Sequence, residues 1–108
     1  METIEEFKGE YFFLSNFYEC PVIFMGLTYK NWESVKDRIM LNIVRAKFIR
    51  NQDLFDKIVA TGVAKLIEGN WWGDKYWGMC NGEGINMLGK ILMFVRSECR
   101  DLSIHKYD

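Results

Sequence analysis

Prolines, histidines and paired cysteines are scarce in this sequence. It contains one proline, one histidine (His105) and three cysteines (Cys20, Cys80 and Cys99) whose spacing forms no C-x-x-C pair. A structural zinc site needs clustered ligands of these types, so neither a metal nor any other cofactor is expected. The odd number of unpaired cysteines is typical of reduced thiols, which predicts a cytoplasmic location.

The sequence also lacks a long apolar run and an excess of charge of either sign. No stretch approaches the roughly 18 apolar residues of a membrane-spanning helix, and the acidic start, residues 1–6, does not resemble a signal peptide. The 14 Lys and Arg residues nearly balance the 15 Asp and Glu residues, for a net charge of −1. Proteins that bind polyanions through phosphate contacts are normally basic. The balance argues against a nucleic-acid coat or a membrane-surface protein, but not against a site for one nucleotide.

Aromatic residues, by contrast, are abundant. They make up 16% of the 108 residues, include four tryptophans, and accompany a hydrophobic fraction of 49%. This length and composition predict a single domain over residues 1–108, because no linker, repeat or low-complexity tract divides the chain. Part of the aromatic excess falls in a glycine-rich stretch, residues 71–84, which packing in a core explains poorly. We therefore expect a ligand-binding loop there.

The residue pattern predicts an α+β fold that is mainly helical, with a small N-terminal β-sheet. Residues 21–25 and 27–29, around Gly26, are rich in β-branched and aromatic side chains and favour two short strands. Residues 64–68 fit either a short helix or a strand. The glycines of residues 71–84 predict a segment that is mostly loop.

Apolar periodicity predicts the helices. They are expected over residues 32–50, 53–60 and 86–99. Asn31 is suited to cap the first, and Gly62 is suited to end the second. On the last helix one apolar face is predicted to form core, and it consists of Leu88, Ile91, Leu92, Val95 and Cys99.

The first long helix carries charges inside its apolar arc. At about 100° per residue, Glu33, Lys36 and Lys47 share that arc with most of the apolar side chains of the helix. A charge in such a place must snorkel, pair or serve a pocket, because burying it alone is costly. For each lysine, a stem along the rim of the core with a solvated ammonium is an equal alternative. For Glu33, complementing the helix dipole is the alternative.

Several ordered segments between residues 7 and 96 carry a resemblance to a known family. In chain order they include Leu14-Ser-Asn-Phe17, Gly26-Leu-Thr-Tyr29, Trp32-Glu-Ser-Val-Lys-Asp-Arg-Ile-Met40, Arg45-Ala-Lys-Phe48, Leu66-Ile-Glu-Gly-Asn70, Asp74-Lys-Tyr-Trp77-Gly78 and Gly84-Ile-Asn-Met-Leu-Gly-Lys-Ile-Leu-Met93. Each segment alone is weakly specific, whereas the ordered set resembles the NADAR/YbiA-like N-glycosidase family. The resemblance implies a YbiA-like fold and cleavage of an N-glycosidic bond. The implied substrate is a small nucleotide, either an ADP-ribose adduct or a ribosylaminopyrimidine phosphate of riboflavin synthesis.

One region departs from the family pattern. In the family, the strand ending at a position like Tyr29 leads to a Glu-His helix, and several tens of residues precede a tryptophan like Trp32. Here Trp32 follows Tyr29 almost at once, so the chain resembles a member shortened between these residues. Two functions stay open: an N-glycosidase, or a catalytically inactive descendant that binds a nucleotide, ADP-ribose or a protein. A homodimer that covers the exposed core of the shortened chain is a further hypothesis.

The expected chemistry selects the candidate site residues. Breaking an N-glycosidic bond develops positive charge at the anomeric carbon, which a carboxylate stabilises. Glu33 and Asp74 are the predicted catalytic residues for this reason. Aromatic, amide and cationic side chains hold a base, a ribose and phosphate, and the predicted substrate-binding residues are Ser15, Asn16, Lys36, Lys47, Glu68, Asn70, Trp77, Asn86 and Arg96.

Many of these residues also suit a purely structural role. Asp74 after Gly73 fits an Asx turn, and Trp77 fits the core. Asn86 fits the N-cap of the last helix. Other structural roles that the sequence leaves open are a turn for Ser15 and Asn16, a cap or surface position for Glu68, and a solvated position for Arg96.

Overall fold

A computed structural model describes residues 2–14 and 32–105, apart from the side chains of residues 12, 32–35 and 105. The α-helices of the described chain are α1 (Trp32–Ile49), α2 (Gln52–Ala60) and α3 (Met87–His105). A 3-10 helix covers Gly9–Leu14. The strands are short, and they are β1 (Thr3–Ile4), β2 (Lys65–Leu66), β3 (Gly69–Asn70) and β4 (Met79–Cys80).

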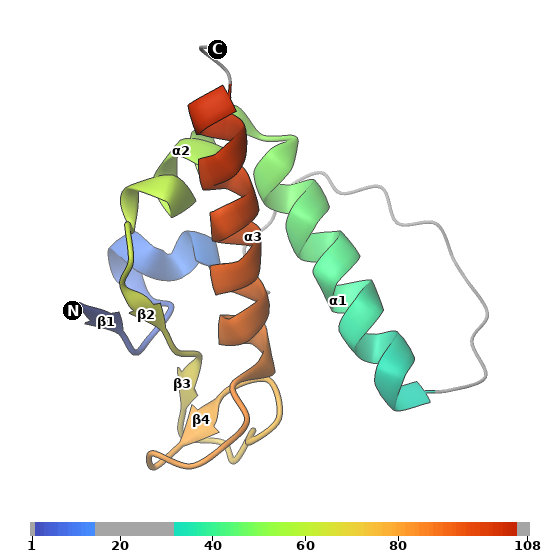
Figure 1. Ribbon diagram of the computed structural model, residues 1–108. Helices are drawn as coiled ribbons and strands as arrows, with labels where there is room; N and C mark the ends of the chain where they lie inside the picture. Colours follow the sequence, from blue (N-terminus) through green and yellow to red (C-terminus); the bar gives the residue numbers. More distant parts are fainter. Residues whose placement is uncertain (1, 15–31, 106–108) are drawn as a thin grey trace.

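The elements are arranged around α3 (Figure 1). Helix α1 lies along one side of α3, and α2 crosses near the C-terminal end of α3. On the other side, β1 pairs in parallel with β2, and β3 pairs in parallel with β4. The loop between β3 and β4 therefore lies at the end of the molecule where α3 begins, and α1 begins at that same end.

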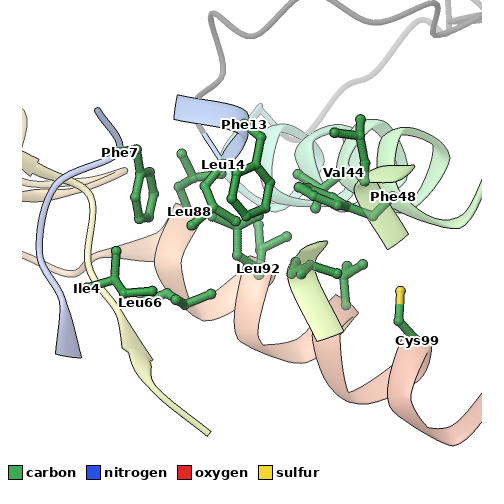
Figure 2. Close-up of a cluster of buried hydrophobic side chains, with 14 of the residues drawn as sticks. Ile4, Phe7, Phe13, Leu14, Val44, Phe48, Leu66, Leu88, Leu92 and Cys99 are labelled. Carbon is green, nitrogen blue, oxygen red and sulfur yellow. The ribbon is translucent and has the colours of Figure 1, made fainter. Parts of the chain in front are cut away.

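The hydrophobic core follows one stripe of α3. Leu88, Leu92, Val95 and Cys99 are fully buried, at the spacing that keeps side chains on one helix face. Large side chains from the surrounding elements complete the cluster (Figure 2), and those that are fully buried are Leu14, Phe48, Ile58 and Leu66. The predicted core face of this helix is thus confirmed, and every helix of the described chain contributes to one core.

The fold class predicted from the sequence, α+β and mainly helical, is confirmed, and α1 and α2 lie where helices were expected. Gly62 follows α2 with φ of +67°, the left-handed conformation that ends a helix and that glycine adopts most easily. Residues 64–68 include a strand, β2, and no helix. The strands predicted at residues 21–29, and the Asn31 cap, lie outside the described residues. Strand β1 comes from the first residues of the chain.

Helix α3 extends beyond its predicted end at Cys99, to His105. The apolar stripe stops at Cys99 because the last turns carry exposed side chains such as Leu102 and Ile104. The spacing of apolar residues marks only the buried stripe, so it predicts a helix end that is too early. The guanidinium of Arg100 donates a hydrogen bond to the Gly62 carbonyl, which ties this extension to the end of α2.

The sequence predicts neither a membrane-spanning segment nor a metal centre. Among the described residues, no helix is both long and apolar enough to span a membrane. Within the same ranges, no three His, Cys, Asp or Glu side chains are grouped to hold a metal ion. Cys80 and Cys99 are buried free thiols, and burial raises the pKa of Cys99 to about 11.

Replacing Leu92 by alanine should destabilise the domain by about 2–5 kcal/mol, because it leaves a cavity at the centre of the core. Urea unfolding followed by circular dichroism measures the change. Leu102→Ala is the matched control, since Leu102 lies on the same helix and is 52% exposed. The control should change the free energy of unfolding by less than about 0.5 kcal/mol. Equal losses in the two variants would contradict the assignment of the core to the inner face of α3.

Candidate active site

Asn86 fastens the segment between β2 and β3 to the start of α3. Its Oδ1 accepts a hydrogen bond from the backbone N–H of Glu68 at 3.0 Å, and its Nδ2 donates to the carbonyl of Leu66 at 2.9 Å. Asn86 is buried and has φ of +57°. An N-cap residue normally has an extended backbone and uses its side chain on its own helix. Asn86 still precedes the first residue of α3, and its carbonyl accepts from the Lys90 N–H at 3.0 Å, so it occupies the N-cap position while its side chain binds the β2–β3 backbone.

Asn70 and Asp74 organise the glycine-rich loop. The Asn70 Nδ2 donates to the Asp74 carbonyl at 2.8 Å and to the Met79 carbonyl at 3.2 Å. The Asn70 Oδ1 accepts from the backbone N–H of Asp74 at 2.9 Å. The Asp74 Oδ1 in turn accepts the backbone N–H groups of Tyr76 and Trp77, at 3.1 Å and 3.0 Å. Asp74 thus makes the Asx turn that its sequence context allowed, and the turn holds its carboxylate in one orientation.

Glu68 is a half-buried acid beside this turn. Its Oε2 is buried and has no hydrogen-bond partner in the described part of the chain. Burial raises the pKa of Glu68 to about 7, and the negative charge of Asp74 raises it further in the same direction. Glu68 therefore holds its proton on a substantial fraction of molecules at neutral pH. A buried polar atom without a partner needs an explanation, and a catalytic role is one of the ordinary ones.

Gly78 allows this close packing around Glu68. A Cβ atom at residue 78 would lie 2.0 Å from the Glu68 carbonyl oxygen and 2.9 Å from the Glu68 Cγ. Those distances are far inside van der Waals contact, so only glycine fits. The backbone of β4 can then donate from Met79 to the Glu68 carbonyl at 2.9 Å. The glycine in the Trp77-Gly78 pair is thus required by the position of Glu68.

Helix α1 reaches the loop through Tyr76. The Lys36 ammonium lies 3.6 Å from the centroid of the Tyr76 ring, a cation–π contact. The Tyr76 hydroxyl donates to the carboxylate of Asp37. The same ring packs edge to face against Trp77 at 4.9 Å. Tyr76 and Asp37 were missed by the sequence analysis, because no periodicity links a charge on the outer side of one helix to a distant loop.

The remaining candidates lie elsewhere or outside the described residues. The buried Arg96 guanidinium donates to the Ala64 carbonyl at 2.7 Å and to the Thr61 hydroxyl at 3.1 Å, which ties α3 to the turn after α2. Lys47 is buried, with its ammonium 5.0 Å from the centroid of the Phe48 ring. Trp77 is half-buried against the core. The described part of the chain excludes Ser15, Asn16 and the Glu33 side chain, and the ligand contacts assigned to all these residues stay predictions.

A surface pocket of about 330 Å³ borders β3 and β4. It is lined by Glu5, Glu6, Ile67, Gly69, Asn70, Met79, Asn81 and Gly82. Neither Glu68 nor Asp74 is among the lining residues. Asn70 borders the pocket and also contacts Asp74, so its side chain connects the two regions.

Together these contacts define an α+β domain that holds a glutamate of raised pKa beside a second carboxyl group, an arrangement suited to general acid–base chemistry. Glu68, Asn70, Asp74, Trp77 and Asn86 form its connected centre. The profile of the NADAR domain family matches residues 24–100. The chain belongs to this family.

Several proteins are similar to a large part of this chain. The N-glycosidase YbiA of Shigella boydii is 46% identical over 70 residues, which are 64% of this chain and 43% of that protein. A riboflavin biosynthesis protein of Vibrio vulnificus is 39% identical over 72 residues, which are 66% of this chain and 19% of that protein. The NMR structure of Escherichia coli YbiA matches with a TM-score of 0.62 at 42% identity, over 74% of this chain and 46% of that chain. This chain thus spans less than half the length of the YbiA relatives it matches.

The raised pKa of Glu68 predicts a specific dependence of stability on pH. Its pKa is about 7 in the folded chain against an ordinary 4.5, so the folded state keeps a proton that the unfolded state loses between these values. The stabilising contribution of Glu68 is therefore complete below pH 4.5 and is lost as the pH rises through 7. The Glu68→Gln chain has no carboxyl proton at this residue to lose. Its free energy of unfolding should therefore rise above that of the native chain by about 1–3 kcal/mol as the pH increases from 4.5 to 7.

Urea unfolding of both chains across this pH range measures the difference. The effects of carboxyl groups that do not interact with Glu68 cancel in the comparison, so the difference reports Glu68 and its interaction with Asp74. A difference between the two free energies that does not change with pH would show that Glu68 titrates as an exposed carboxyl group.

Proposed function

We propose that this chain hydrolyses the N-glycosidic bond of an N-ribosylated nucleotide. The substrate is an ADP-ribose adduct of a base or a ribosylaminopyrimidine phosphate. The family and the names of the relatives, an N-glycosidase and a riboflavin biosynthesis protein, support this class. The observation that carries the proposal is the half-buried carboxyl of Glu68, which lies beside Asp74 and has a pKa of about 7. Its Oε2 is buried without a hydrogen-bond partner among the described residues.

In the proposed reaction, Glu68 is the general acid. It donates its proton to the departing nitrogen as the bond between this nitrogen and the anomeric carbon breaks. The Asp74 carboxylate stabilises the positive charge that develops on the sugar. A water molecule then bonds to the anomeric carbon, and its proton returns to Glu68. The products are the free base and the sugar with a hydroxyl group at the anomeric carbon.

The Asx turn prepares Asp74 for this task. Its Oδ1 is engaged by two backbone N–H groups, of Tyr76 and Trp77. The carboxylate therefore needs no reorganisation when charge develops, which is the usual origin of electrostatic stabilisation in an active site. Lys36, whose ammonium lies over Tyr76, is the proposed phosphate contact on the α1 side of the loop. Glu33, the other predicted catalytic residue, is proposed to contribute from the start of α1.

Binding without hydrolysis is the second candidate function. The observation that favours it is the departure from the family pattern after Tyr29, where Trp32 follows almost at once and the implied Glu-His helix has no counterpart. A chain without it would retain the loop with Glu68 and Asp74 as a nucleotide-binding element.

The test is release of free base from ADP-ribosylated guanine and from ribosylaminopyrimidine phosphates. Glu68→Gln and Asp74→Asn should each lower kcat by about 10²- to 10⁴-fold, the usual contribution of an acid–base residue. Both replacements keep the shape of the side chain, and the asparagine amide keeps an oxygen that can accept the hydrogen bonds of the turn.

Glu83→Gln is the matched control for the release assay. Glu83 lies in the same glycine-rich stretch, but its carboxylate is exposed and pairs with Lys75 at 3.2 Å. Its replacement should leave kcat unchanged. Binding of these compounds by the native chain without release of base would refute the hydrolase and favour the binding module.

The pH dependence of kcat is a further prediction. The general acid must carry its proton, so kcat should fall as the pH rises through about 7, the pKa of Glu68. Initial rates of base release between acidic and alkaline pH give the midpoint. A rate that rises over the same range would assign Glu68 the role of a base and contradict the proposed step.

A further inference from the structure

Two tryptophans of the glycine-rich loop face solvent. Trp71 is 81% exposed and Trp72 is 52% exposed. Tryptophan offers one of the largest apolar surfaces of any side chain, and exposing it forgoes the hydrophobic stabilisation that burial would give. Large exposed apolar groups that lie together commonly mark a binding surface. The pair takes no part in the carboxylate chemistry proposed above.

The exposure is built into the loop. The side chain of Asn70 bonds both backbone groups of Asp74, its Nδ2 to the carbonyl at 2.8 Å and its Oδ1 to the N–H at 2.9 Å. These bonds close a loop over residues 70–74, and Gly73 turns the chain with φ of +87°. Trp71 and Trp72 form the tip of this closed loop. The Asn70 bonds thus hold the backbone on both sides of the two tryptophans.

The two rings form a corner. Their centroids are 5.8 Å apart and their planes meet at 85°, so one ring presents its face beside the edge of the other. A flat aromatic ligand can stack on a face and contact the neighbouring edge at the same time. The neighbours along the chain, Gly73 and Lys75, are exposed and add no apolar side chain. The two rings by themselves offer about the surface of a small planar ligand, well below the area of a stable protein interface.

We propose that Trp71 and Trp72 bind the base of a nucleotide by stacking. The ligand class is a purine or pyrimidine joined to a ribose phosphate. The choice of ligand rests on the proposed function, because the same loop follows Glu68 closely and carries Asp74. Base stacking on aromatic side chains is tolerant of base identity, since every base has a flat face. Trp77, the sequence-based candidate for this contact, is packed against Tyr76 and the core.

NMR titration of the tryptophan indole N–H groups tests the proposal. The native chain is titrated with AMP and, separately, with ribose 5-phosphate, which lacks a base. AMP should shift the Trp71 and Trp72 signals in a saturable way, and ribose 5-phosphate should leave them in place. The signals are assigned from Trp71→Phe and Trp72→Phe. The absence of a shift with AMP, or equal shifts with both compounds, would overturn the proposal.

Variants measure the contribution of each ring. Trp71→Ala and Trp72→Ala should each raise the Kd for AMP by about 5- to 150-fold, the range for loss of one stacking contact. The phenylalanine variants should retain most of the affinity because they keep a flat ring. Phe94→Ala is the control, since Phe94 is an exposed aromatic residue on α3, and it should leave Kd unchanged. An unchanged Kd in the Trp71→Ala, Trp72→Ala double variant would exclude the pair as the binding site.

The test of the stacking site can be read independently of whether the chain hydrolyses a substrate. AMP should bind to the native chain and shift the Trp71 and Trp72 signals whether or not the chain releases base from the substrates named above. Turnover of substrate with a KM that the tryptophan variants do not change would support the hydrolase and overturn the stacking site. Tryptophan signals that move with protein concentration instead of AMP would assign the tip to self-association and also overturn it.

Discussion

The backbone between β2 and the loop is held by the side-chain amides of two asparagines, and the candidate site depends on this constraint. Asn86 bonds the backbone at Leu66 and Glu68 from the start of α3. Asn70 bonds the carbonyl and the N–H of Asp74 from within the loop. An amide can donate and accept at once, so each asparagine side chain fixes two backbone groups. Glu68 lies between the two fixed points.

This arrangement leaves one oxygen of the half-buried Glu68 carboxyl buried without a hydrogen-bond partner among the described residues. Such an oxygen lowers stability, and the core along α3 must offset the loss. The core and the site share that helix: its inner stripe packs the large side chains, and its first turn follows Asn86. Arg96, further along α3, bonds the turn before β2 and secures the other end of the same segment. Acids with strongly raised pKa values in otherwise well-packed domains are commonly found at functional sites.

The segment from Glu68 to Asp74 combines two kinds of group that we propose to act on different parts of a nucleotide. In the proposed reaction Glu68 and Asp74 provide the proton and the charge that cleavage of a glycosidic bond requires, while Trp71 and Trp72 offer flat apolar surface. Asn70 connects the two sets, because the bonds that orient Asp74 also hold the tryptophans at the tip. The loop is then attached to α1 through the contacts of the Tyr76 ring and hydroxyl. The geometry of the loop is thus set by polar contacts, and its tip is left open.

The helices, the core stripe of α3 and the helix stop at Gly62 could be predicted from the sequence by itself, because each depends on spacing or on the conformational freedom of one residue. The sequence also located the glycine-rich loop and its carboxylates, through composition and family resemblance. Only the tertiary structure decided that Glu68 is the acid with the raised pKa, that the Asn86 side chain binds the backbone between β2 and β3, and that Tyr76 reaches Asp37. These features join segments distant in the chain, and burial and pKa depend on such neighbours, which no local pattern encodes.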